Sequence, residues 1–307
     1  VLDEMLPYFS EYYTNPSSIY SPSRMVSKRV EEARKLIAGT IGAEASEIYF
    51  TSGGSESDNW AIKKIMISRM NKGKHMITTK VEHHAVLESC KYLESLGFEV
   101  TYLNVNEDGL IDLNELESSI REDTILVSIM AANNEIGTLM PLKEIGSICK
   151  KHKVLFHTDA VQAYGNIPID VNEMNIDLLS TSAHKIEGPK GIGFLYVRKG
   201  VMITPLISGG MQEKGKRAGT TNAPGIIGFA KACELKFSEM EKNNEYVLNL
   251  REHLIDRVLS EIPYVRLNGS RDKRLVGNAN FSFQFIEGEG MLLKLDALGI
   301  CASSGSA

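Results

Sequence analysis

The chain has 307 residues, of which 43% are apolar and 24% charged, and its formal net charge is -5. This length holds one large domain, or a large and a small one, around a sizeable core, and the composition excludes general disorder. The acidic balance argues against a dedicated nucleic-acid-binding protein, and no apolar run is long enough to cross a membrane.

The first two thirds of the chain alternate short apolar strands with amphipathic helices. Helical spacing over residues 2–13 is followed by a loop at 15–18 and a strong amphipathic helix over 23–37. The pattern then predicts strands at 48–50, 75–79, 99–103, 125–130, 154–157, 178–180 and 193–197, and helices at 55–70, 84–96 and 145–151. This alternation indicates an α/β fold with a mostly parallel central sheet sandwiched by helices. Such sheets bind ligands at the carboxyl ends of their strands.

The pattern changes after Pro224. A long helical stretch runs to about residue 260, followed by strands at 264–267 and 280–285 and a helix at 288–298. We therefore predict a large domain over residues 1–238 and a smaller α+β domain over 239–307. The chain opens on Val1 and closes in a serine- and glycine-rich run, so we expect the gene product to extend beyond both ends and the small domain to be incomplete.

The four cysteines are Cys90, Cys149, Cys233 and Cys301. None belongs to a CxxC pair and their spacings match no zinc pattern, so no metal site is predicted. Three are expected to be buried as small apolar residues, and Cys301 is placed on an apolar strand at 298–300. This cysteine usage favours a reducing, cytoplasmic setting.

A glycine-rich turn lies between the strand at 48–50 and the helix that follows it. Gly53 and Gly54 allow a ligand to approach the backbone closely, and the free N–H groups at a helix start attract an anion such as phosphate. The alternative is a plain helix start, with Ser55 as the N-cap and the glycines only making the turn.

Asp159 follows the strand at 154–157, at the carboxyl edge of the predicted sheet. With Gln162 one turn later, its carboxylate could hold a cationic ring nitrogen. The alternative is an aspartate that caps the next helix.

Lys185 follows the strand at 178–180, with Ser182 and His184 beside it and a Gly-Pro-Lys-Gly run after it. A lone lysine in such a place is usually a surface residue of a turn. However, a phosphate-type turn, a strand-end aspartate and a strand-end lysine are together the three parts that pyridoxal phosphate needs. We therefore predict that Lys185 carries this cofactor as a Schiff base.

Two further strand ends carry polar residues. His83 could stack on a flat cofactor, although a histidine that starts a helix is the alternative, a role for which His84 is the default. Asn134 follows the strand at 125–130, where a turn containing two asparagines is the ordinary explanation.

In their order and spacing these residues resemble the class V, fold-type I enzymes that use pyridoxal phosphate, and specifically the cysteine desulfurases of the NifS/IscS kind. The similarity covers nearly the whole chain. The matching stretches are 15–18, 50–57, 82–83, 133–137, 157–162, 182–191, 216–220 and 303–307.

The resemblance implies a role for each candidate residue. Lys185 would bind the cofactor covalently and later move protons, and Asp159 would keep the pyridine nitrogen protonated. His83 would stack on the ring and act as an acid or base. The remaining contacts implied are Gln162 and Asn134 to the ring's phenolic oxygen, Asn134 to the substrate carboxylate, Gly54, Ser55, Ser182 and His184 to the phosphate, and Thr220 to the phosphate of the partner subunit in a homodimer.

The implied reaction converts L-cysteine to L-alanine and leaves the sulfur on the enzyme as a persulfide. The sulfur would pass to an iron-sulfur scaffold or another acceptor protein. The nucleophilic cysteine is expected at the position immediately after Ala307, and Cys301 is a poor substitute because it is placed on a strand. The alternatives are another class V enzyme, such as a selenocysteine lyase, and an inactive homologue that serves as an assembly platform.

Overall fold

The computed structural model describes residues 1–304 and is built around a seven-stranded sheet with the strand order β1-β7-β6-β5-β4-β2-β3. The strands are β1 (Ile48–Thr51), β2 (His75–Thr79), β3 (Glu99–Leu103), β4 (Thr124–Ser128), β5 (Leu155–Asp159), β6 (Leu178–Ser180) and β7 (Gly193–Val197). Only β7 runs against its neighbours, since its pairings with β1 and β6 are antiparallel and the other four pairings are parallel. The prediction of a mostly parallel sheet is confirmed.

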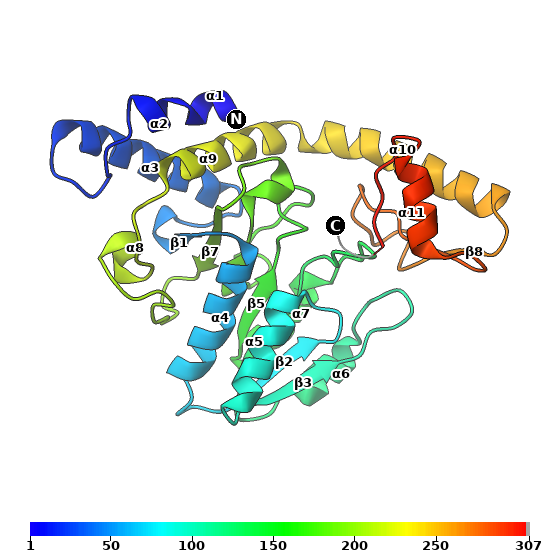
Figure 1. Ribbon diagram of the computed structural model, residues 1–307. Helices are drawn as coiled ribbons and strands as arrows, with labels where there is room; N and C mark the ends of the chain where they lie inside the picture. The colour runs from blue at the N-terminus through cyan, green and yellow to red at the C-terminus, as the bar shows by residue number, and fades with distance from the viewer. Residues whose placement is uncertain (305–307) are drawn as a thin grey trace.

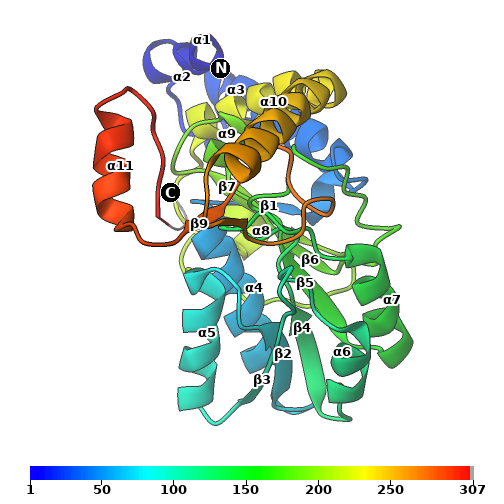
Figure 2. The ribbon, with the colours of Figure 1, turned by 90° about the vertical axis from the view of Figure 1, so that its right-hand side faces the viewer.

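Helices cover both faces of this sheet (Figures 1 and 2). On one face lie α4 (Gly54–Ser68) and α5 (His84–Ser95), and on the other α6 (Leu113–Ser119) and α7 (Leu142–His152). Each face has its own apolar core: Trp60 and Leu93 belong to one, and Ile145 and Phe156 to the other. Because helices bury both faces, β2, β4 and β7 are buried along their whole length.

A second, two-stranded sheet follows in the last part of the chain. It pairs β8 (Val265–Leu267) with β9 (Phe281–Phe283), and α11 (Gly288–Asp296) comes next. The single long helix predicted before it is two helices, α9 (Ala223–Ser238) and α10 (Met240–Glu261), which part at Glu239. Helix α9 packs on α3 (Ser21–Gly39) in the large body, whereas α10 packs on β8. We propose Glu239 as the boundary between the two predicted domains.

Other differences from the predicted elements are local. The first helix is two short ones, α1 (Leu2–Met5) and α2 (Pro7–Ser10), because Pro7 lacks the N–H that a continuous helix needs. The short elements η1 (Ala45–Glu47), η2 (Ala183–Ile186), α6 and α8 (Gln212–Gly215) were not predicted.

The burial of the cysteines agrees with the prediction, but the strand predicted beside Cys301 does not form. Cys90, Cys149 and Cys233 are buried, which confirms the prediction. The strand predicted at 298–300 is wrong: Gly299 has a φ of 76°, outside the extended range, and Cys301 is exposed and lies in no strand.

Among the described residues, no helix is long and apolar enough to span a membrane. The predicted loop motif at 303–307 lies mostly outside the described residues.

Candidate active site

A cavity of about 230 Å³ lies where several strands of the main sheet end. Nine of the ten candidate residues line it: Gly54, Ser55, His83, Asn134, Asp159, Gln162, Ser182, His184 and Lys185. The remaining one, Thr220, is exposed and does not line this cavity. Residues more than 100 positions apart in the chain therefore meet at one place, as expected of a parallel sheet.

The turn from β1 to α4 forms one wall. Gly53 has a φ of 147°, which a side chain would resist, and a Cβ at Gly54 would lie 2.5 Å from Val161 Cγ2. Gly53, not Ser55, is the N-cap of α4, so the interpretation of Ser55 as a capping residue is wrong. The Ser55 hydroxyl is exposed in the first turn of α4, where the backbone N–H groups have no partners within the helix. Hydroxyl and N–H groups together suit a phosphate.

The turn η2 brings Ser182, His184 and Lys185 to the same wall directly after β6. The Ser182 hydroxyl lies 2.7 Å from His184 Nδ1. Burial lowers the pKa of His184, and the positive charges of Lys185 and Lys190 lower it further. The ring is therefore neutral near pH 7, and Lys185 itself is half-buried beside it.

Asp159 is the last residue of β5 and is buried. Its Oδ1 accepts a hydrogen bond of 2.9 Å from the Val161 N–H. Burial raises the pKa of Asp159, while this hydrogen bond and the nearby His83 oppose the rise. The carboxyl is thus held firmly and faces a cavity in which a cationic partner would favour its ionised form.

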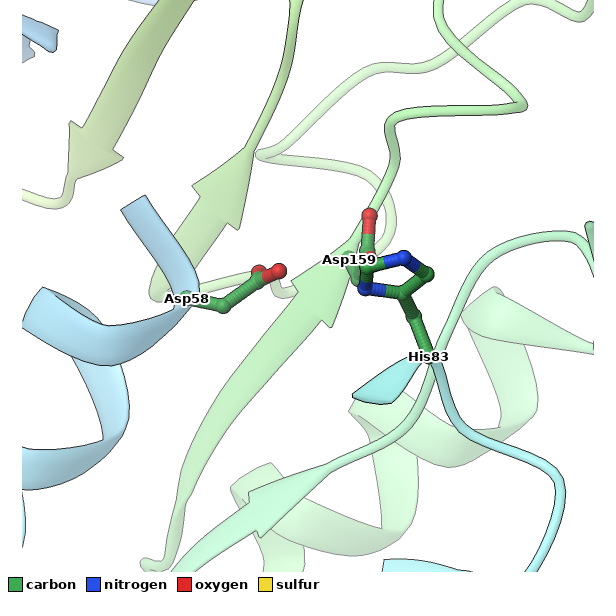
Figure 3. A group of neighbouring side chains, drawn as sticks. All are labelled: Asp58, His83 and Asp159. Atoms are coloured by element: carbon green, nitrogen blue, oxygen red, sulfur yellow. The ribbon is translucent and has the colours of Figure 1, made fainter. Parts of the chain in front are cut away.

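His83 faces Asp159 from the N-terminus of α5 (Figure 3). It is the N-cap of that helix, and its Nδ1 accepts a hydrogen bond of 3.1 Å from the Ala85 N–H. A neutral ring in this arrangement carries its proton on Nε2. The helix-start alternative is confirmed for His83, which also lines the cavity, while its stacking on a cofactor stays a prediction. His84 is exposed as the first residue of the helix.

Sequence reasoning missed two buried acids at this site, Asp58 and Glu82. Asp58 lines the cavity and Glu82 lies just before His83. Positions 54, 58, 61 and 65 form the buried stripe of α4, and Asp58 is the one carboxylate on it. The signal that could have found Asp58 is an acidic residue at the helical spacing of the uncharged residues that face the core.

Glu82 makes the stability of the protein depend on pH. Its Oε1 accepts hydrogen bonds from Thr79 Oγ1 and the Met130 N–H, but burial still raises its pKa from 4.5 to about 8. Between these values the folded state holds a proton that the unfolded state has released, so stability falls as pH rises. In Glu82→Gln we expect this decline to flatten between about pH 4.5 and 8. Urea midpoints of both proteins across that range test it, and parallel pH profiles would contradict it.

The model of the family described as Aminotransferase class-V matches residues 1–307. The chain belongs to this family. It is 56% identical to the cysteine desulfurase IscS of Methanosarcina thermophila over 307 residues, which are 100% of this chain and 76% of that relative. A cysteine desulfurase IscS of Dictyoglomus turgidum is 54% identical and is covered to 78% of its length.

Solved structures give the same result for the fold. A NifS-like protein superposes with a TM-score of 0.96 at 40% identity, over 99% of this chain and 83% of that one. A structure described as SspA in complex with cysteine has a TM-score of 0.85 at 39% identity, over 100% of this chain and 85% of the other. The class V, fold-type I expectation from the sequence is confirmed.

Class V enzymes of this kind depend on pyridoxal phosphate, and the cavity fits that group. It offers an amine at Lys185 and a buried carboxyl at Asp159. The start of α4 lines the same cavity at Gly54 and Ser55, where a phosphate could bind. These are the aldehyde partner, the ring-nitrogen partner and the phosphate anchor that the cofactor requires.

Proposed function

We propose that this chain is a cysteine desulfurase that converts L-cysteine to L-alanine and passes the sulfur, held as an enzyme persulfide, to an acceptor protein for iron-sulfur cluster assembly. The observation that carries the proposal is the meeting of Lys185, Asp159 and His83 in one cavity. Chains named cysteine desulfurase that are 54–56% identical over this chain support the same activity.

The bound cofactor would supply an electron sink for the bonds around the carbon that carries the substrate nitrogen. Lys185 would hold it through Nζ and then move a proton at that atom. Asp159 would keep the ring nitrogen protonated, because an anionic carboxylate in a buried site favours a cationic partner. The cofactor's other contacts would come from Gly54, Ser55, Ser182 and His184 at the phosphate, and from Gln162 and Asn134 at the phenolic oxygen.

His83 would stack on the cofactor ring and act as an acid or base. In the neutral ring Nδ1 accepts the Ala85 N–H and Nε2 carries the proton, so the ring takes up a second proton only when Nδ1 gives up that hydrogen bond. Asn134 is half-buried on the cavity wall and would hold the substrate carboxylate. The nucleophilic cysteine is proposed at the position after Ala307.

Two alternatives are less well supported. An inactive assembly platform would have no use for Lys185, Asp159 and His83 gathered around one cavity. A selenocysteine lyase would need the same cofactor site, and the relatives described above are named for cysteine.

We also propose a homodimer in which Thr220 reaches the partner subunit's cofactor phosphate. Thr220 is exposed and lies outside its own cavity, as that role requires. Met202 and Met211, on the same stretch of chain, and Ile19 expose apolar side chains that a partner would cover. All four cysteines are free thiols, which favours the reducing cytoplasm.

The reaction is tested with the complete protein, including the residues after Ala307. With L-cysteine and a thiol reductant we expect alanine and sulfide in equal amounts. L-selenocysteine is the comparison substrate. Alanine from selenocysteine with none from cysteine would favour the lyase, and no product from either would favour the platform.

A further inference from the structure

Asp58 is a buried acid at the cavity to which the proposed reaction assigns no role. It lies on α4, one helical turn after Gly54, and its side chain points toward Asp159 and His83 (Figure 3). The residue is 1% exposed, and its Oδ1 has no hydrogen-bond partner in the part of the chain that the structure describes. One carboxyl oxygen of Asp58, one carboxyl oxygen of Asp159 and one ring nitrogen of His83 all lie within 4.8 Å of one another.

No positive charge balances Asp58 from the sheet beneath it. His157 Nε2 lies 3.7 Å from Asp58 Oδ1, but burial lowers the pKa of His157 to about 3, so that ring is neutral. Both ring nitrogens are also engaged by hydroxyl groups, Nδ1 with Ser128 at 2.8 Å and Nε2 with Ser180 at 3.0 Å. The contact with His157 is therefore not an ion pair.

Apart from His83, which lies near both carboxyls, the groups that shift the pKa of Asp58 are acids and one hydroxyl. Burial raises the pKa of Asp58 well above its ordinary value, and the nearby Asp159 and Glu82 carboxyls raise it further. Only the Ser180 hydroxyl, from β6, opposes this rise. An ionised Asp58 would thus be a buried anion among other acids.

Asp159 differs in what stabilises its anion. It accepts the Val161 N–H, and His83 lies close enough to lower its pKa. Two carboxyls this near one another in a buried site do not both ionise near neutral pH. The proton therefore stays on the carboxyl whose anionic form is less stabilised, which is that of Asp58.

We propose that Asp58 is a positioning residue whose buried carboxyl stays protonated, so that Asp159 remains the single anionic carboxylate facing the cofactor ring. Its role toward the cofactor rests on the proposed function, whereas its protonation does not. A neutral carboxyl beside Asp159 supplies a hydrogen-bond donor and adds no second negative charge to the cavity.

The proton itself is tested on cofactor-free protein by infrared spectroscopy at pH 7 and 8. The difference between wild type and Asp58→Asn should contain a protonated-carboxyl band that wild type has and the variant lacks. No such band in the difference spectrum would overturn the proposal. Asp3→Asn, at an exposed position on α1, is the matched control and should remove no protonated-carboxyl band.

The role toward the cofactor is tested by titrating cofactor-free variants with pyridoxal phosphate. Asn resembles a neutral carboxyl, so Asp58→Asn should bind within about 3-fold of wild type, whereas Asp58→Ala loses the polar group and should bind at least ~10-fold more weakly. Equal weakening in both variants would mean an ionised Asp58, and no weakening in either would mean no role. Asp58→Ser replaces the alanine variant if that protein does not fold. If wild type does not bind the cofactor, the proposed function fails and the infrared result still decides the proton.

Discussion

Lys185→Ala should abolish the release of alanine from L-cysteine, with a loss of about 10⁴-fold or more, while the protein stays folded. The size of the loss follows from removing a group that forms a covalent bond and also moves a proton. Lys185 lies half-buried on the cavity wall, in a turn with Ser182 and His184, so its removal leaves the apolar cores untouched. The measurement is single-turnover alanine formation, together with visible absorbance of the purified protein after incubation with pyridoxal phosphate.

Lys190→Ala is the matched control. Lys190 follows in the same stretch of chain, but it is exposed and does not line the cavity. This variant should keep the colour and most of the activity. A Lys185→Ala protein that is coloured and active, or a Lys190→Ala protein that is as inactive as Lys185→Ala, would contradict the assignment of Lys185.

Much of the candidate site could be predicted because it follows the ends of strands. Apolar runs marked β1, β5 and β6. Strands β5 and β6 pair in parallel, and β1 runs in the same direction because β1 and β6 are both antiparallel to β7, so the three carboxyl ends lie at one edge of the sheet. Polar residues at or just past those ends, such as Asp159 and Lys185, are therefore expected to lie near one another. Residue spacing alone carried this information.

Asp58 could not be found this way because it lies inside a helix, not after a strand. Its place at the cavity depends on how α4 packs across the sheet, which is a tertiary property. The split of α1 from α2 at Pro7 was readable in principle, since proline lacks an N–H. By contrast, α6 is a single short helix of two turns whose burial is limited to Leu116, too little for periodicity to reveal.

The backbone of α8 is a second feature that the sequence could not predict. Glu213 and Lys214 both have positive φ values, 46° and 57°, in a conformation that side chains seldom adopt. No local pattern predicts such a backbone. It is stabilised by residues far away in the chain, above all by Arg34 of α3.

Glu213→Ala should destabilise the fold by about 3 kcal/mol, because it removes the buried partner of the Arg34 guanidinium and leaves the exposed Glu31 to pair with that charge. The two side chains are 6% and 7% exposed and pair through two hydrogen bonds of 2.7 and 2.8 Å. Glu213 also accepts the Phe50 N–H at 2.9 Å, so the alanine variant loosens β1 directly before the glycine turn at the cavity. Urea unfolding followed by circular dichroism measures the loss.

The comparison that isolates burial is Glu261→Ala, which breaks an ion pair of similar geometry with Arg257 on the exposed face of α10. Water already screens that pair, so its loss should cost far less stability than the loss of the buried pair. Arg34→Met combined with Glu213→Met removes both charges at once and should recover part of the stability that Glu213→Ala loses. Equal losses from Glu213→Ala and Glu261→Ala would contradict the argument, because then burial of the charge would not set the cost. If the double variant is stable but binds pyridoxal phosphate weakly, the ion pair matters for holding the β1 turn in place and not only for folding.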